Sequence, residues 1–176
     1  MNKVFFAKTK GESYSLQSSA AHSLLKKSIS SYINCSENEI TILKDEKGKP
    51  YLKDIQDLYI SISHTKGAVM VGFSDHPLGV DIEGVKMRRK SVEKRVFTKD
   101  ESTLLDASKD ENAAFFTLWT LKESYLKAIG TGFCDNAKEA EFYSLSNPVK
   151  SGADGFVFET GEWEGFVFSV CEKNDY

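Results

Sequence analysis

The chain has 176 residues, of which 40% are hydrophobic and 12% aromatic, so it can bury the core of one domain or of two small halves. This composition excludes a disordered chain, and no apolar run approaches the ~20 residues of a membrane-spanning helix. The N-terminal residues become charged too soon for a signal peptide, and the three cysteines (Cys35, Cys134 and Cys171) form no ligand motif. We therefore expect a cytoplasmic protein with reduced, structural thiols and no membrane contact.

The net charge of −3 hides one basic stretch. Residues 85–95 contain six basic side chains and a single acidic one, Glu93. An acidic protein with one basic stretch is a poor candidate for nucleic-acid binding and suits one acidic partner or a phosphorylated small molecule. A solvated surface run is the simpler alternative.

The first elements are a strand and a helix. Residues 4–7 predict a strand, and apolar residues recur at helical spacing over 13–33, where Asn34 can end the helix. Residues 39–43 predict a short strand, and residues 45–50 a charged turn.

Three further strands are predicted in the middle of the chain. Residues 58–63 alternate between polar and apolar side chains, residues 68–73 form a second strand, and residues 80–83 a third. The connections are short, so we expect the three strands to pair as an antiparallel meander.

Two helices follow. Thr98 and Glu101 have the spacing of a capping box, which predicts a helix to about residue 107. A longer helix starts at Ser108 or Asp110 and ends at Gly130.

Three closing strands are predicted over 141–145, 155–160 and 165–171. The order of strand, helix and strands therefore occurs twice along the chain. This order indicates an α+β fold with two similar α/β halves, residues 1–77 and 78–176.

Two acids lie close together in the third middle strand. Asp81 and Glu83 are two residues apart, so both side chains leave the same face, roughly 7 Å apart. Two like charges at this separation repel each other unless a cation lies between them. A hard divalent cation that binds phosphates uses a few protein oxygens of this kind and leaves its other positions to water and substrate.

The long helix adds a third acid. Glu123 and Lys127 are spaced i, i+4 and lie on one side of the helix. A surface ion pair worth ~0.3–0.5 kcal/mol is the alternative interpretation. That alternative leaves Lys122 unexplained, because helical spacing puts Lys122 near the middle of the apolar stripe. A lysine there is costly unless it reaches a phosphate, a carboxylate or water, and we expect Lys122 to contact a substrate.

Other candidate residues have two interpretations each. Glu101 is the natural partner of Thr98 in the capping box, and it is also a candidate metal neighbour or general base. His64 follows Ser63 at a strand end and can donate hydrogen bonds to phosphate oxygens, although a turn histidine is the alternative. His22 and His76 have no obvious partner, and we assign both to structural roles.

Four blocks of the sequence resemble the signature motifs of the 4'-phosphopantetheinyl transferases. They are ISH at residues 62–64, PLGVDIE at 77–83, FTKDE at 97–101 and WTLKESYLK at 119–127, and GKP at 48–50 is a fifth point of similarity. The resemblance covers about residues 47–133 and is greatest to the Sfp-type branch. In that branch one chain holds two similar α/β halves with small antiparallel sheets, arranged as a pseudo-dimer.

This resemblance implies an enzyme of the holo-acyl-carrier-protein synthase type. Such an enzyme uses Mg²⁺ to transfer the 4'-phosphopantetheine arm of coenzyme A to a serine of an apo acyl or peptidyl carrier protein, and it releases 3',5'-ADP. Such transfer serves fatty-acid, polyketide or nonribosomal-peptide biosynthesis.

The resemblance also implies roles for particular residues. Asp81, Glu83 and Glu123 match the Mg²⁺ ligands, and Ser63 and His64 match contacts to the phosphates of coenzyme A. Lys49 matches a residue near the adenosine end. Lys127 would steady the pyrophosphate, and Glu101 would be the base for the carrier serine. The docking of the carrier protein on the basic run Lys86–Arg95 is our own inference from its charge.

The chain departs from the family in its first half. Sfp-type proteins carry basic residues in the first helix region for the 3'-phosphate of coenzyme A, whereas residues 18–25 here read SSAAHSLL. We expect a monomer, with self-association as the alternative, because the shorter first half would weaken the pseudo-dimer. Two other functions remain open: a metal-dependent nucleotide or pyrophosphate hydrolase, and a non-catalytic module that binds coenzyme A or a carrier protein.

Overall fold

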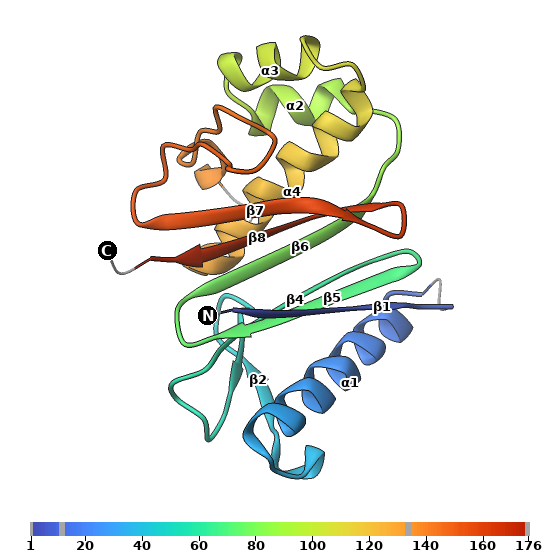
Figure 1. The fold of residues 1–176 in the computed structure, drawn as a ribbon, viewed down its shortest axis with the longest axis vertical. Coiled ribbons are helices and arrows are strands. Elements are labelled where there is room, and N and C mark those ends of the chain that lie inside the picture. The colour runs from blue at the N-terminus through green and yellow to red at the C-terminus, as the bar shows by residue number, and fades with distance from the viewer. Residues whose placement is uncertain (1, 11–12, 133–134, 175–176) are drawn as a thin grey trace.

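Two three-stranded antiparallel sheets form the centre of the molecule, and a long helix packs on the outer face of each (Figure 1). The structure is a computed structural model that describes residues 2–10, 13–132 and 135–174. The fold is therefore α+β with small antiparallel sheets, as the sequence predicts. No helix in these described ranges is long and apolar enough to cross a membrane.

The first sheet has the strand order β1–β5–β4, and its strands are β1 (Lys3–Lys8), β5 (Ala68–Ser74) and β4 (Tyr59–Thr65). The second sheet has the order β6–β8–β7, with strands β6 (Leu78–Gly84), β8 (Phe166–Lys173) and β7 (Phe156–Trp163). A small hairpin joins β2 (Ile42–Lys44) to β3 (Pro50–Leu52). The helices are α1 (Tyr14–Ile33), α2 (Lys90–Val96), α3 (Lys99–Asp106) and α4 (Glu111–Ile129), with short 3-10 turns η1 (Glu37–Glu39) and η2 (Asp135–Lys138).

The helix ends lie where the capping residues predict them. The Ser13 hydroxyl accepts a hydrogen bond from the Leu16 amide at the start of α1, and Asn34 ends α1 in the left-handed conformation. Thr98 and Glu101 form a complete capping box at α3. Asp110 caps α4, and Gly130 ends it.

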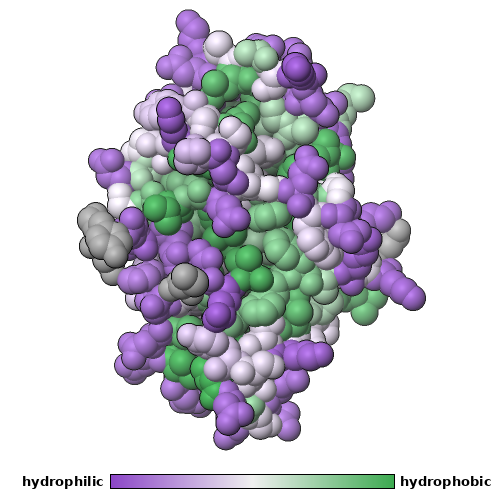
Figure 2. All heavy atoms as spheres, viewed as in Figure 1, coloured by the Kyte–Doolittle hydropathy of each residue, from purple (hydrophilic) through white to green (hydrophobic). Residues whose placement is uncertain are grey.

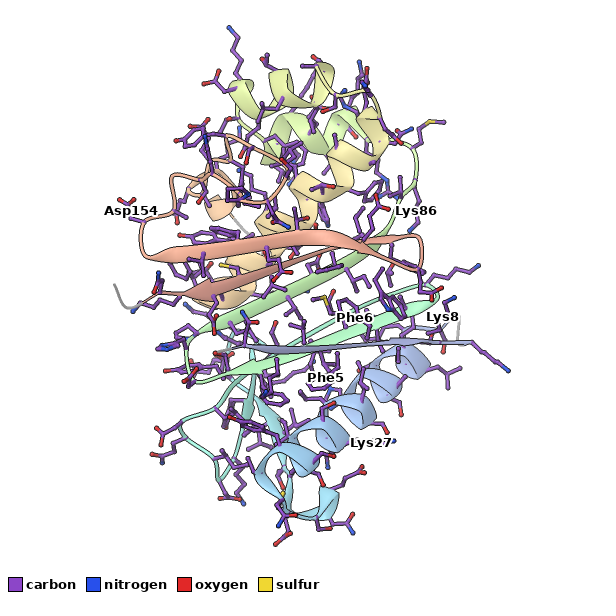
Figure 3. All side chains as sticks on the ribbon, in the orientation of Figure 1. Phe5, Phe6, Lys8, Lys27, Lys86 and Asp154 are labelled. Carbon is purple, nitrogen blue, oxygen red and sulfur yellow. The ribbon has the colours of Figure 1, made fainter. Side chains whose placement is uncertain are left out.

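Alternating side chains divide the interior into layers. On β5, Val69 and Val71 face α1, whereas Met70 faces the second sheet. On β1, Phe5 stacks on Phe73 within the first layer, whereas Phe6 stacks on Trp163 and meets Phe168 edge to face across the two sheets. Figure 3 shows these two neighbouring phenylalanines on opposite sides of β1. The two sheets therefore pack face to face.

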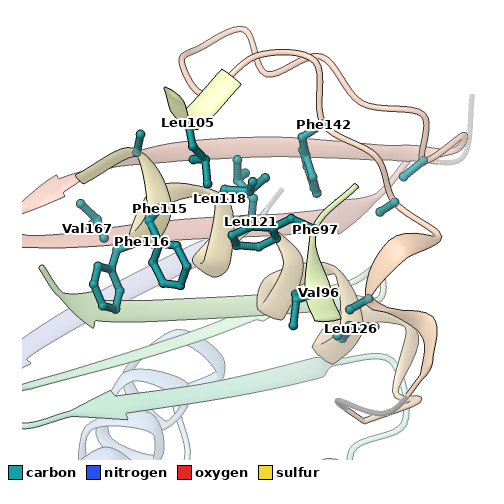
Figure 4. Packing of buried hydrophobic residues seen from close by; sticks show 14 residues of the cluster. Val96, Phe97, Leu105, Phe115, Phe116, Leu118, Leu121, Leu126, Phe142 and Val167 are labelled. Atoms are coloured by element: carbon teal, nitrogen blue, oxygen red, sulfur yellow. The ribbon is translucent and has the colours of Figure 1, made fainter. Parts of the chain in front are cut away.

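A third layer lies between α4, α3 and the segment that follows α4. Its core includes Phe115, Leu118 and Leu121 of α4, together with Leu105 of α3 and Phe142 (Figure 4). On the molecular face seen in Figure 2, apolar residues gather across the middle, and charged residues surround them.

The predicted three-stranded meander is wrong. β4 and β5 pair as a hairpin, but the next strand, β6, pairs with β8 in the other sheet. The backbone amides of Val80 and Ile82 on β6 bond instead to side-chain hydroxyls of β4, from Ser61 and Ser63. The polar face of β4 therefore lies at the contact between the sheets and not in solvent.

Several local predictions also differ from the structure. The strand expected over 39–43 is shifted to Ile42–Lys44, because Ser36 and Glu39 form a capping box that starts η1. β3 begins at Pro50, where a turn was expected, and α2 occupies part of the basic run. Residues 141–145 form no strand, and Phe142 makes a single bridge to Ser151. Cys35 and Cys171 are free thiols, and Cys134 lies outside the described residues.

Candidate active site

The site begins where β6 lies directly against α4. Gly79 of β6 has no side chain, and a Cβ there would lie 1.8 Å from the Ser124 carbonyl oxygen of α4. Any larger residue would therefore push the strand away from the helix. This close approach brings Asp81 beside Glu123 and Lys127.

Asp81 is fixed by two partners on one of its oxygens. Its Oδ1 lies 2.7 Å from the Lys127 ammonium and accepts a second hydrogen bond of 2.7 Å from the Ser63 hydroxyl. Lys127 also donates to the Val80 carbonyl at 3.0 Å. The other oxygen, Oδ2, is buried and has no partner among the described residues. A buried carboxylate oxygen without a partner is costly, so Asp81 is positioned to accept one more cation or donor.

Glu83 extends the same row of acids. Its Oε2 accepts a hydrogen bond of 3.0 Å from the Thr65 hydroxyl of β4. Burial and the nearby Asp81 charge raise the pKa of Glu83. Thr65 was not among the predicted site residues, although it continues the polar alternation of β4 after Ser61 and Ser63.

Glu123 completes the acidic group from α4. Burial, followed by the charges of Asp81 and Glu83, raises the pKa of Glu123 to about 7, and Lys127 partly opposes this shift. Three carboxylates in one place therefore cannot all be charged at low cost without a cation.

These acids open into one pocket of about 340 Å³, which lies between the two sheets and their helices. The pocket brings together six of the predicted site residues: Ser63, His64, Asp81, Glu83, Glu123 and Lys127. It is also lined by residues that were not predicted, from α1 and from the β2–β3 hairpin, namely Tyr14, Ser18, His22 and Lys44.

The opposite edge of the pocket is basic. Burial, then the charges of Lys44 and Lys26, lower the pKa of His22. Burial and Lys127 lower the pKa of His64, whose Nδ1 lies 3.2 Å from the Gln17 side-chain oxygen. His22, for which a structural role was expected, lies at the pocket with Lys44 next to it. One end of the pocket attracts cations, and the other attracts anions.

Lys49 lies in a second pocket of about 190 Å³, which also has Glu123 and Lys127 in its wall. Its ammonium donates a hydrogen bond of 2.6 Å to the Ala128 carbonyl oxygen near the end of α4. Burial lowers the pKa of Lys49.

Glu101 and Lys122 lie together, away from both of these pockets. The Lys122 ammonium is 2.7 Å from Glu101 Oε1, and both side chains are fully buried. Glu101 also accepts from the Thr98 and Phe142 amides, and Lys122 donates to the Ala140 carbonyl. Lys122, whose burial in the apolar stripe would be unfavourable without a partner, therefore has a carboxylate partner. Neither residue lines the pocket that holds the acids.

Arg88 differs from the other basic residues of this run, because it is nearly buried and paired with acids of the protein. Its guanidinium contacts Glu93, Asp106 and Glu111 at 2.8–2.9 Å, and only 6% of its side chain is exposed. Arg88 therefore joins the loop after β6 to three helices, and it is not available to a partner. Lys86, Arg89 and Lys90 are exposed, and Figure 3 shows Lys86 at the edge of the molecule.

The acids fit a magnesium ion with few protein ligands. No group of three His, Cys, Asp or Glu side chains within the described ranges is already assembled as a metal site. Mg²⁺, however, is usually held by one or two carboxylates together with water and substrate phosphates. The unpartnered Asp81 oxygen and the raised pKa values of Glu83 and Glu123 are consistent with such an ion.

Comparison with known proteins shows the family to which the chain belongs. The sequence profile of the 4'-phosphopantetheinyl transferase superfamily matches residues 77–171, more than half of the chain. The chain belongs to this superfamily.

Its relatives include Sfp-type enzymes. The chain is 35% identical to 4'-phosphopantetheinyl transferase gsp of Aneurinibacillus migulanus over 161 residues, which cover 84% of this chain and 65% of that protein. It is 37% identical to 4'-phosphopantetheinyl transferase Sfp of Bacillus subtilis over 111 residues, which cover 62% and 50%. It is 30% identical to the human L-aminoadipate-semialdehyde dehydrogenase-phosphopantetheinyl transferase over 139 residues, which cover 70% and 45%. The matched segments thus span between 45% and 65% of the length of these relatives.

Proposed function

We propose that the chain is a cytoplasmic enzyme that transfers the 4'-phosphopantetheine arm of coenzyme A to a serine of an apo acyl or peptidyl carrier protein. The pocket that joins Asp81, Glu83, Glu123 and Lys127 carries this proposal, because its acids suit a metal-bound pyrophosphate. In the reaction, the serine oxygen forms a bond to the phosphorus of the arm. The bond from that phosphorus to the bridging oxygen breaks, and 3',5'-ADP leaves.

Asp81, Glu83 and Glu123 would hold Mg²⁺, which when bound offsets the negative charge of the pyrophosphate. Lys127 reaches the same place from α4 and would stabilise charge on the leaving phosphate. Ser63 orients Asp81, and Thr65 orients Glu83. His64 lines the pocket with them and would contact phosphate oxygens.

The proton of the carrier serine needs an acceptor in this pocket. With no metal bound, burial raises the pKa of Glu123 to about 7, but Mg²⁺ held by this carboxylate would lower that pKa, so Glu123 would serve as a metal ligand and not as the base. Glu101 was the candidate base from the sequence, but its two oxygens are engaged by backbone amides and by Lys122. We therefore assign the role of proton acceptor to a water held beside the acids of the pocket. We assign the buried pair Glu101 and Lys122 to holding α4 in position.

The basic edge of the pocket would bind the 3'-phosphate of coenzyme A. His22 and Lys44 line the pocket there, and Lys26 on α1 is close enough to His22 to affect its pKa. For the carrier protein we propose the loop after β6, where Lys86, Arg89 and Lys90 surround the exposed side chains of Val85 and Met87. A carrier with an acidic surface would complement these charges.

We also propose that the chain works as a monomer whose two halves, residues 1–77 and 78–176, share the pocket. Each half contributes one sheet and one long helix, and α1 and α4 line opposite sides of the pocket. This arrangement resembles a pseudo-dimer, so both halves are needed for substrate binding.

Intact-mass measurement tests the proposed function. The protein is incubated with coenzyme A, Mg²⁺ and an apo carrier protein. A carrier that gains the mass of phosphopantetheine supports the proposal. Release of 3',5'-ADP with an unchanged carrier would indicate a hydrolase, and no turnover with retained coenzyme A binding would indicate a binding module.

A further inference from the structure

Lys49 connects the β2–β3 hairpin to the end of α4. Its Nζ lies 2.6 Å from the carbonyl oxygen of Ala128, in the last turn of the helix. Carbonyls in the last turn have no partner within the helix and form the negative end of the helix dipole. The ammonium of Lys49 therefore donates a hydrogen bond to this carbonyl oxygen. It also interacts favourably with the negative end of the helix dipole.

The stem of Lys49 passes over a glycine that leaves room for it. A Cβ at Gly130 would lie 2.9 Å from Lys49 Cδ. Gly130 has a φ of +73°, which also suits glycine at the end of a helix. The end of α4 is thus shaped to receive Lys49.

The hairpin is equally well fixed on its own side. Asp45 Oδ1 accepts hydrogen bonds from the amides of Lys47 and Lys49 at 2.9 and 2.8 Å. The Asp45 amide donates to the Lys49 carbonyl at 3.0 Å. The turn that carries Lys49 is therefore closed within the hairpin, and it is the Lys49 side chain that spans from this turn to α4.

The pocket of about 190 Å³ lies between the two elements that Lys49 joins. Lys47, Gly48 and Pro50 of the hairpin form one wall, and Glu123 and Lys127 of α4 lie in the other. Burial lowers the pKa of Lys49, and its ammonium already has a protein acceptor. A substrate anion would have to compete with the Ala128 carbonyl for it.

We propose that Lys49 is a positioning residue that holds the β2–β3 hairpin at a fixed distance from α4. It thereby sets the width of the pocket in which Glu123 and Lys127 lie. Lys49 acts through the helix end and not by contact with the substrate. The predicted effect of Lys49 on the KM for coenzyme A rests on the proposed function, whereas its predicted effect on the order of the hairpin does not.

Three variants and a control test this proposal. Lys49→Met keeps most of the stem and removes the donor. Gly130→Ala leaves Lys49 unchanged but displaces its stem, and the double variant combines both. Lys53→Met is the matched control, because it removes an exposed lysine near the hairpin that lines neither of the pockets that contain Glu123 and Lys127.

The first readout is the NMR order parameter of the Gly48 and Lys49 amides in the protein without ligand. We expect values near 0.85 in the unaltered protein and in the control, and values of about 0.6 in Lys49→Met and in Gly130→Ala. Unchanged order parameters in Lys49→Met would overturn the proposal. This readout needs no activity, so it remains decisive if the chain transfers no phosphopantetheine.

The second readout is the KM for coenzyme A in the carrier assay. We expect both single variants to raise this KM about five-fold with kcat changed less than about two-fold, and the double variant to match the single ones. If Lys49 contacted the substrate directly, Lys49→Met would raise the KM while the order parameters of the Gly48 and Lys49 amides stayed near 0.85. That result would contradict the positioning role.

Discussion

Lys127 and Asp81 join α4 to β6 through a contact of 2.7 Å between ammonium and carboxylate, at a point where the carboxylate is nearly buried and the ammonium is partly open. The second oxygen of Asp81 remains without a partner among the described residues. Asp81 can therefore accept a metal ion and keep its contact with Lys127. In the proposed function, this strand and this helix would together hold a cation and a phosphate in one pocket.

Stability should depend on pH through Glu123. The pKa of Glu123 is about 7 in the folded protein and near 4.5 in the unfolded chain, so the folded state binds the proton more tightly. The free energy of unfolding of the metal-free protein should therefore fall as pH rises from about 4.5 to 7. Glu123→Gln should be more stable than the unaltered protein at pH 8, on the order of 2–3 kcal/mol, and similar to it near pH 4.

Denaturant unfolding at a series of pH values checks this prediction. Glu159→Gln, a change to an acid of β7 outside the pocket, is the control and should follow the unaltered protein. Identical pH profiles for Glu123→Gln and the unaltered protein would show that Glu123 is not the titrating group.

The buried pair of Glu101 and Lys122 should behave as a coupled structural unit. Glu101→Gln or Lys122→Met alone leaves an uncompensated buried group and should cost about 3–5 kcal/mol of unfolding free energy. The double variant should recover a large part of this loss. A double-mutant cycle from denaturant unfolding measures the coupling, and additive losses would refute it.

The pH dependence of transfer distinguishes this structural role from catalysis by Glu101. If the double variant folds, it should keep the pH profile of kcat, because neither Glu101 nor Lys122 takes a proton in the proposed reaction. A changed pH profile in the double variant would return the role of base to Glu101.

Substitutions of Arg89 and Lys90 should affect carrier docking, whereas substitution of Arg88 should affect stability. Arg89→Ala with Lys90→Ala should raise the KM for the carrier about three- to ten-fold and leave the KM for coenzyme A unchanged. Arg88→Ala should instead lower the thermal midpoint, because it releases Glu93, Asp106 and Glu111.

Steady-state kinetics with each substrate varied in turn, together with thermal unfolding, measure both effects. Lys27→Ala removes an exposed positive charge from α1 (Figure 3) and controls for net charge. An equal rise in both KM values for the Arg89 and Lys90 variant would remove the docking proposal.

The basic edge should discriminate between coenzyme A and 3'-dephospho-coenzyme A. Lys44→Ala and His22→Ala should each weaken binding of coenzyme A about five- to ten-fold and leave the dephospho form nearly unaffected. Isothermal titration with both ligands measures the difference, again with Lys27→Ala as control. Equal losses for the two ligands would show that Lys44 and His22 do not contact the 3'-phosphate.

The sequence predicts the ends of α1, α3 and α4 because their signals are local. Ser13, Thr98 and Gly130 mark helix ends through bonds to nearby residues. The spacing of Asp81 and Glu83, and of Glu123 and Lys127, fixes which side of an element they share. Which elements then meet depends on long-range packing, such as the contact that Gly79 permits between β6 and α4.

The other features depend on partners that are distant in the sequence. Lys122 has the spacing of a core residue, but its partner Glu101 comes from another helix. Lys44 lies on a short hairpin outside α1. No local sequence pattern therefore predicts that Lys44 lies near His22. The departure of β6 into the second sheet follows from its pairing with β8, which comes more than eighty residues later. Such contacts are decided by packing and not by periodicity.

The most direct test of the central claim is the carrier-mass assay with Mg²⁺ varied, for the unaltered protein, Asp81→Asn and Asp154→Asn. Asp154 is an exposed acid that does not line the pocket, and Figure 3 shows it at the edge of the molecule, so it serves as the control. We predict that the unaltered protein and Asp154→Asn add phosphopantetheine to the carrier only when Mg²⁺ is present. Asp81→Asn should fold but lose at least about 1,000-fold in rate. Undiminished transfer by Asp81→Asn, or full transfer by the unaltered protein in a chelator, would contradict the account.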